Sequence, residues 1–239
     1  WHSIDLREGL SRATGLSVQI ENPARACALS QMWTENNKAG SKLKSDNFVY
    51  VSISDGVGVG IVVGGELVRG AENKAGEFGH IPLNLEGPRC LCGALGCWEA
   101  YVSNLATLSR YFGHDMTKNG PDPSELFLRK DFTVNEVISR AYDGDTKAIE
   151  AIETTAKYLG LGLANVIKAL NPGFVYIGGE ITAAWDMIEA TVRTGLSERA
   201  LTDEAVDIPI RIVRSTEYPR LRGAAALLAF PAFAAPRVA

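Results

Sequence analysis

Four residues within one short stretch of the chain have the side chains and the spacing of a metal site. His80, Cys90, Cys92 and Cys97 form the pattern H-x9-C-x-C-x4-C. One imidazole and three thiolates complete a tetrahedral zinc site, and they leave no coordination position open for a substrate. Glycines between the cysteines permit the tight turns that such a loop needs. The pattern therefore predicts a structural zinc ion that shapes the loop.

Other interpretations of the cysteines stay open at this point. A disulfide among the three is one alternative, although three is an odd number and nothing marks the chain as secreted. A set of scattered free thiols is another. The fourth cysteine, Cys27, lies in the apolar segment ARACALSQMW. We expect it to be a small buried core residue.

Two glutamates lie close to the predicted metal ligands in the sequence. Glu77 precedes His80 by three residues, and Glu99 follows Cys97 by two. A histidine that binds a metal through one ring nitrogen usually hydrogen-bonds through the other, and in a cleft that second group could be a ligand. Carboxylates are acceptors suited to sugar hydroxyls. Each glutamate alone is more often a solvated surface residue, but their positions on either side of the metal ligands favour a binding site.

Together these residues resemble the signature of the ROK family, which groups sugar-responsive repressors and sugar kinases. The similarity rests on GEFGH at 76–80 and on CLCGALGCWE at 90–99. It extends over nearly the whole chain, through the segments 14–33, 54–80 and 171–182. These three segments resemble the family's sugar-cleft segment, its glycine-rich phosphate loop with the hairpin behind it, and its adenosine-side strand and turn.

The resemblance implies a fold and a ligand. The fold is α/β, of the ribonuclease-H-like or actin-like ATPase type, with a cleft between two lobes. In the family, the histidine of this signature binds both zinc and sugar, and the two glutamates also contact the sugar. Carried over to this chain, the resemblance implies sugar contacts from Asn22, Glu77, His80 and Glu99.

Two departures from the family's kinases argue against catalysis. Those kinases have Asn-Asp where this chain has Asn22 and Pro23, and the Asp is the general base that takes the proton from the attacking sugar hydroxyl. Proline has no titratable group, although it suits the first residue of the following helix. Glu21 would point the opposite way if its segment is a strand. The chain also lacks the D-x-G-x-T turn with which family kinases open.

The glycine-rich segment SDGVGVG has two interpretations. Ser54, Asp55, Gly56 and Gly58 resemble a phosphate loop, because glycines let backbone N–H groups approach a phosphate. Asp55, however, brings a negative charge to the place where an anion would lie. A plain hairpin turn between two apolar strands explains the segment about as well.

The apolar patterns predict strands and helices in alternation, which is typical of an α/β fold. Residues 34–46 and 113–123 are predicted to be a loop and a linker. Helices are expected at 4–14, 23–33, 99–112, 133–145, 145–171, 182–196 and 222–230. Strands are expected at 17–21, 47–53, 59–65, 174–179 and 208–213, and 66–70 is a candidate for one more.

We expect two units in this chain. Residues 46–221 form a second lobe that carries the zinc loop, and residues 1–45 with 222–239 form part of a first lobe that is truncated at its N-terminus. The strand expected at 17–21 and a few helices cannot bury a sheet face well. Upstream residues or a partner chain are therefore expected to cover that edge, and the native protein is expected to be larger.

Composition narrows the classes of function. The 239 residues carry a formal net charge of −4, which argues against a basic surface for nucleic acid or acidic membranes. No run approaches the roughly 20 apolar residues that span a bilayer. No signal segment is visible either, so we expect a cytoplasmic protein without membrane contact.

The favoured function is a sugar-sensing effector domain of a transcriptional regulator, which binds a hexose or an amino sugar in the cleft without catalysis. DNA contact is implied only through an upstream helix-turn-helix that is not present in this chain. The alternative is an ATP-dependent sugar kinase of the same family, and a third class is a degenerate fold kept as an oligomerisation or scaffold module. The resemblance also implies a homodimer or homotetramer.

Overall fold

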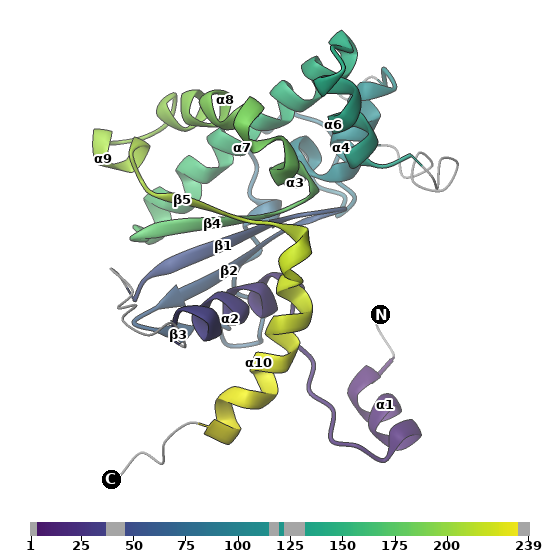
Figure 1. Cartoon of the computed structure of the whole chain (residues 1–239), viewed down its shortest axis with the longest axis vertical. Coiled ribbons are helices and arrows are strands. Elements are labelled where there is room, and N and C mark those ends of the chain that lie inside the picture. Colours follow the sequence, from purple (N-terminus) through teal and green to yellow (C-terminus); the bar gives the residue numbers. More distant parts are fainter. Residues whose placement is uncertain (1–3, 37–45, 115–119, 122–131, 234–239) are drawn as a thin grey trace.

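The structure is a computed structural model that describes residues 4–36, 46–114, 120–121 and 132–233 (Figure 1). In the described part of the chain, a five-stranded mixed sheet has the strand order β3-β2-β1-β4-β5. β1 pairs antiparallel with β2 and parallel with β4, and β4 pairs parallel with β5. The strands are β1 (Phe48–Ile53), β2 (Val57–Val63), β3 (Glu66–Leu67), β4 (Phe174–Gly179) and β5 (Ile210–Val213).

Helices cover both faces of this sheet, which confirms the α/β class (Figure 1). α2 and α10 pack together on one side, and α7 lies on the other with α8 beside it. The helices are α1 (Leu6–Thr14), α2 (Pro23–Asn36), α3 (Glu99–Val102), α4 (Asn104–Tyr111), α6 (Val134–Tyr142), α7 (Thr146–Leu170), α8 (Trp185–Ser197), α9 (Asp203–Val206) and α10 (Pro219–Phe233). Short 3-10 turns are η1 (Phe78–His80), η2 (Glu180–Ala184) and η3 (Ser215–Glu217).

The central strands are apolar on both faces because both faces are covered. All six residues of β1 are buried. Phe48 of β1 lies opposite Phe174 of β4 and stacks on it, with ring centroids 5.3 Å apart. Parallel strands buried on both sides have nearly continuous apolar sequences. This is why the strands at 47–53 and 174–179 can be recognised from sequence.

α7 has clear signals at both ends. The Asp145 carboxylate accepts hydrogen bonds from two backbone N–H groups of the first turn, at 2.9 and 3.3 Å. Asn171 ends the helix in the left-handed conformation, with a φ of 42°. Gly160 lets α8 approach closely, since a Cβ there would lie 2.1 Å from the Val192 carbonyl oxygen. The helical layer that supports the site is therefore tightly packed.

α1 lies apart from the sheet (Figure 1). Asp5 caps its first turn, and Gly15 ends it with a φ of 70°. The helix expected at 4–14 is confirmed. None of its residues is buried, and its leucines are exposed.

The strand expected at 17–21 is wrong. These residues connect α1 to α2 without joining the sheet. No strand lies beside them in the described part of the chain. An alternating apolar pattern forms a strand only where a neighbour takes up its backbone N–H and C=O groups.

The single helix expected at 99–112 is two helices, α3 and α4. The break falls at Ser103, whose backbone is extended with a ψ of 159°. Its hydroxyl caps α4 by accepting a hydrogen bond from the Ala106 N–H at 3.2 Å. A 3-10 turn, η2, likewise replaces the first residues of the helix expected at 182–196. Serine occurs both within helices and at their caps, so the pattern did not reveal the break.

The other expected elements lie within three residues of their predicted bounds. α2 extends into the loop expected at 34–46, and most of that loop lies outside the described residues. The same holds for most of the linker expected at 113–123. Over the residues that the structure describes, no helix has both the length and the apolar character needed to cross a bilayer.

Candidate functional site

The predicted metal ligands lie on a loop that folds back on itself between η1 and α3. The Leu83 N–H donates to the Gly96 carbonyl at 2.8 Å, and the Trp98 N–H donates to the Ile81 carbonyl at 3.0 Å. Gly96 has a φ of 68°, and a Cβ there would lie 1.6 Å from the Asn84 carbonyl oxygen. Only glycine fits this position, so the path of the loop depends on it.

This loop brings the four predicted ligands to one point. The ligand atoms of His80, Cys90, Cys92 and Cys97 all lie within 4.8 Å of one another. The Cys92 and Cys97 sulfurs are 3.7 Å apart, and the Cys90 sulfur is 3.8 Å from Nδ1 of His80. Zinc–sulfur bonds of about 2.3 Å in a tetrahedron would separate two sulfurs by about 3.8 Å. The cluster could therefore hold a tetrahedral metal ion.

The cysteines differ in their surroundings and in the pKa of their thiols. All four cysteines are free in the structure, and none forms the disulfide that was the alternative. Burial raises the pKa of Cys90 and of Cys97, whereas a hydrogen bond from the Ala94 N–H lowers the pKa of Cys92. A bound cation favours the thiolate form of all three. Cys27 is buried in the core, as expected.

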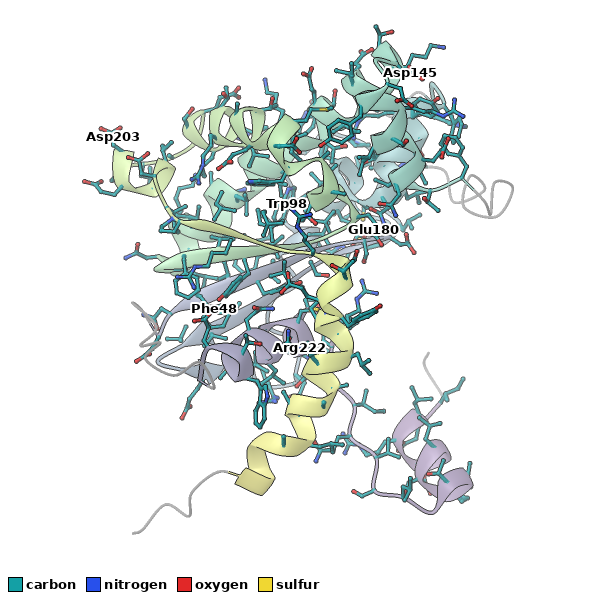
Figure 2. The ribbon with its side chains drawn as sticks, in the orientation of Figure 1. Phe48, Trp98, Asp145, Glu180, Asp203 and Arg222 are labelled. Carbon is teal, nitrogen blue, oxygen red and sulfur yellow. The ribbon has the colours of Figure 1, made fainter. Side chains whose placement is uncertain are left out.

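Trp98 packs against α7 and so anchors the metal loop to the helical layer. Its side chain is 1% exposed, and its indole N–H donates to the Tyr158 carbonyl on α7 at 3.0 Å. Gly162 of α7 makes room for the ring, since a Cβ there would lie 2.0 Å from an indole carbon. Figure 2 shows Trp98 between the sheet and the helices above it. The next residue, Glu99, is thereby placed relative to the core.

The metal cluster adjoins a cavity of about 270 Å³. Asn22, Glu77, His80 and Glu99 all line this cavity, although they come from three separate segments of the chain. The structure thus brings the four residues predicted to contact sugar to one place. The other residues in its wall are Pro23, Ala24, Ser52, Ser54, Gly56, Val57, Gly58 and Arg220.

Internal hydrogen bonds hold two of these side chains. The Asn22 Oδ1 atom accepts from the backbone N–H groups of Ala24 and Arg25, at 2.9 and 3.4 Å, and so caps α2. This capping role was not predicted, and it leaves the amide N–H groups for another partner. The Glu99 Oε2 atom accepts from the Val57 N–H at 2.9 Å. Both residues are therefore fixed by the elements that form the cavity wall.

The Glu21 carboxylate forms an ion triad with Arg25 and Arg69. It lies 2.6 Å from Arg25 Nε and 3.0 Å from Arg69 Nε, and the Glu21 and Arg25 side chains are 7% and 6% exposed. Burial raises the pKa of Glu21, but hydrogen bonds from Arg25 and from the Asn22 N–H lower it. Together these hydrogen bonds and the arginine charges outweigh burial, so the pKa lies below its ordinary value. Arg25 also donates to the Ala75 carbonyl at 3.2 Å. The triad therefore joins the start of α2 to the loop before η1.

The segment that resembles a phosphate loop is the turn between β1 and β2. Ser54, Gly56 and Gly58 line the cavity, whereas Asp55 is exposed. A Cβ at Gly56 would lie 2.8 Å from Glu99 Oε2, and one at Gly58 would lie 2.8 Å from a side chain of α2. Close packing accounts for these glycines, and phosphate binding stays a prediction.

Sequence reasoning missed several residues of the cavity wall, and Arg220 is the charged one among them. Arg220, in the first turn of α10, lines this cavity and also a neighbouring one of about 270 Å³ beside Tyr50 and Gly179. A guanidinium donates to hydroxyls and to anions alike. No motif pointed to it, because α10 reaches the site from the far end of the chain.

These features can be set beside those of known proteins. The model of the ROK family matches residues 1–229. The chain belongs to the ROK family. The xylose repressor of Bacillus subtilis (strain 168) is 32% identical over 199 residues, which make up 83% of this chain and 47% of the repressor. A glucokinase of Halalkalibacterium halodurans is 33% identical over 217 residues, which make up 89% of this chain and 63% of the kinase.

Solved ROK structures share the fold of this chain. A ROK family transcriptional regulator, a homolog of the E. coli MLC protein, matches with a TM-score of 0.72 at 29% identity, over 93% of this chain and 54% of that one. A ROK family glucokinase from Streptomyces griseus, in complex with glucose and AMPPNP, matches with a TM-score of 0.74 at 25% identity, over 93% of this chain and 71% of that one. The actin-like ATPase fold is thus confirmed. The chain spans about half the length of the first curated relatives that it matches, and regulators and kinases both occur among them.

Proposed function

We propose that this chain is the sugar-sensing effector region of a ROK transcriptional regulator, which binds a hexose or an amino sugar without phosphorylating it. The observation that supports this most is Pro23 in the wall of the cavity. A kinase needs a general base within hydrogen-bond reach of the attacking hydroxyl, and proline cannot serve as one. Glu21, which is close in sequence, is occupied by two arginines.

The cavity offers sugar hydroxyls both donors and acceptors. In this proposal Glu77 and Glu99 accept from hydroxyl groups, and the Asn22 amide donates to one. Nδ1 of His80 faces the cysteine cluster, so Nε2 is the ring nitrogen left for the sugar. A hydrogen bond to a charged group contributes about 1.5–3 kcal/mol, so losing one should weaken binding about 10-fold or more.

Zinc is the metal that suits the three cysteines and one histidine of the cluster. When bound, it would stabilise three thiolates and fix the loop without acting on the sugar, because the four residues fill its coordination positions. His80 belongs to both the metal cluster and the cavity wall. Metal binding and sugar binding are therefore expected to depend on each other.

The second candidate function is an ATP-dependent sugar kinase, which the glucokinase relatives favour. It would require a general base other than residue 23. In the sensor proposal, DNA contact comes only through a helix-turn-helix outside this chain, and the protein is a homodimer or homotetramer. The division into a first lobe (1–45 with 222–239) and a second lobe (46–221) belongs to the same proposal.

Calorimetric titration of the chain with glucose, galactose and N-acetylglucosamine, together with a coupled ATP-dependent phosphorylation assay, tests the proposal. We expect at least one sugar to bind and none to be phosphorylated. Glu77→Gln should weaken binding about 10-fold. Glu72→Gln is the matched control, because Glu72 is an exposed residue that pairs with Lys74. Sugar-dependent phosphorylation would favour the kinase instead, and sugar binding that Glu77→Gln leaves unchanged would contradict the assigned cavity.

A further inference from the structure

A second cavity, of about 680 Å³, lies between the metal loop and the helices α4 and α7. Its wall includes loop residues between 84 and 88, residues of α3 and α4, and one side of α7. It shares no lining residue with the proposed sugar cavity. Small-molecule sites usually measure about 300–1,000 Å³, so this cavity has the size of a ligand site.

Arg110 of α4 contributes a guanidinium to this cavity. Its Nη1 donates to Thr155 Oγ1 at 2.8 Å, and its Nη2 donates to the Tyr101 carbonyl. Its Cζ lies 5.9 Å from the centre of the Tyr158 ring. Among the residues that the structure describes, Arg110 forms no ion pair with a carboxylate. A guanidinium has five N–H donors, and these two hydrogen bonds use two of them.

The buried charge of Arg110 favours an anion beside it. Burial lowers the pKa of Arg110 to about 10, so the group stays charged at neutral pH while it is largely removed from water. A charge in such surroundings is costly unless it is paired. The wall also includes His114, Lys147, Glu86 and Glu150. The lysine and both glutamates are exposed, so their charges are screened by solvent.

We propose that this cavity binds a small oxyanion carried on a ring, such as a phosphate monoester or a carboxylate of a cyclic compound. The anionic group accepts from the remaining N–H donors of Arg110. The ring lies along the aromatic wall, where Tyr101 and Tyr158 stack with centroids 4.2 Å apart and Tyr111 completes the surface. Aromatic side chains provide large apolar contact areas for such a ring.

A ligand in this cavity would contact the elements that carry the proposed sugar site. Arg110 donates a hydrogen bond to the carbonyl of Tyr101, which lies two residues after Glu99 on α3. Gly87 of the metal loop packs against the same tyrosine so closely that a Cβ there would lie 2.0 Å from the hydroxyl. The oxyanion is thus placed to change sugar affinity through α3 and the loop. This regulatory step rests on the proposed function, whereas oxyanion binding does not.

Calorimetric titration of the sugar-free chain with phenyl phosphate and benzoate tests the site, with benzyl alcohol as the uncharged control. We expect both anions to bind and benzyl alcohol to bind at least about 10-fold more weakly. Arg110→Gln should weaken phenyl phosphate binding about 10-fold or more. Lys157→Gln is the matched control on α7, because Lys157 pairs with Glu198 and does not line the cavity. If Arg110→Gln does not fold, Thr154→Trp fills the cavity while keeping the arginine, and it should also abolish binding.

Several results would overturn the site. No binding of phenyl phosphate at concentrations up to about 10 mM is one. Phenyl phosphate binding that is equally tight in wild type, Arg110→Gln and Thr154→Trp would also overturn the site. Loss of phenyl phosphate binding in Arg220→Gln would place the anion in the proposed sugar cavity or the cavity beside it.

A second experiment tests the coupling to sugar binding. Saturating phenyl phosphate should change the sugar Kd at least about 3-fold, and an unchanged Kd would refute the coupling. A chain that binds phenyl phosphate but no sugar would contradict the proposed function and leave the oxyanion site supported.

Discussion

Replacing Glu21 with glutamine removes the negative centre of the buried ion triad beside the proposed sugar cavity. The Glu21 carboxylate accepts from the Asn22 N–H at 2.9 Å, from Arg25 Nε at 2.6 Å and from Arg69 Nε at 3.0 Å. Glutamine keeps the size of the side chain and one acceptor oxygen, but not the charge. Arg25, whose side chain is 6% exposed, then retains the Ala75 carbonyl as a partner and loses its counter-ion.

The expected cost follows from the burial of each pair. Removing one partner of a buried ion pair costs about 3–5 kcal/mol. The pair with Arg69 contributes no more than about 1 kcal/mol, because the Arg69 side chain is 42% exposed. The amide of glutamine replaces part of the lost hydrogen bonding. We therefore expect Glu21→Gln to lower the free energy of unfolding by about 3 kcal/mol, and Arg69→Gln, the matched control, by about 1 kcal/mol or less.

Urea unfolding at pH 7 measures both losses, and acidification gives a second test. The folded pKa of Glu21 lies below its ordinary value of 4.5. Its carboxylate therefore stabilises the fold above that pH, and this contribution is lost as the pH falls through the folded pKa. The stability difference between wild type and Glu21→Gln should shrink on acidification below pH 4.5. A loss under about 1 kcal/mol at pH 7, or a difference that is constant with pH, would refute the reasoning.

Two further substitutions test how the metal loop is held. Gly96→Ala should lower the metal content measured by elemental analysis, because its Cβ would lie 1.6 Å from the Asn84 carbonyl oxygen; a full metal complement would contradict this. Trp98→Phe removes the indole N–H and leaves the buried Tyr158 carbonyl without that donor. It should lower the free energy of unfolding by about 1–3 kcal/mol in urea unfolding, whereas an unchanged value would show that the hydrogen bond contributes nothing.

The metal ligands could be predicted from sequence because all four lie on one loop. His80 and the three cysteines are close in the chain, so their spacing alone limits how the loop can fold. The cavity residues were predicted in a different way. The spacing of Asn22 and Glu99 does not indicate that they lie together. Only the resemblance to the ROK family predicted that both contact the same sugar.

Features that depend on contacts between distant segments were not predictable. The Glu21 triad requires Arg69, which lies 48 residues further along the chain. Arg220 reaches the cavity only because α10 packs beside α2. The segment 17–21 has the pattern of a strand but no neighbour among the described residues. In each case the local pattern is compatible with several tertiary surroundings, and packing selects one of them.

The central claim is that a metal ion on the cysteine loop holds His80 toward the proposed sugar cavity. The most direct test measures zinc content and sugar affinity on the same preparations of wild type and Cys92→Ser, with Cys27→Ser as the control for a cysteine outside the cluster. We predict about one zinc ion per chain in wild type and in Cys27→Ser. Cys92→Ser should lose the zinc and weaken sugar binding at least about 10-fold. Wild-type protein without stoichiometric metal, or a Cys92→Ser variant that binds sugar as tightly as wild type, would contradict the account.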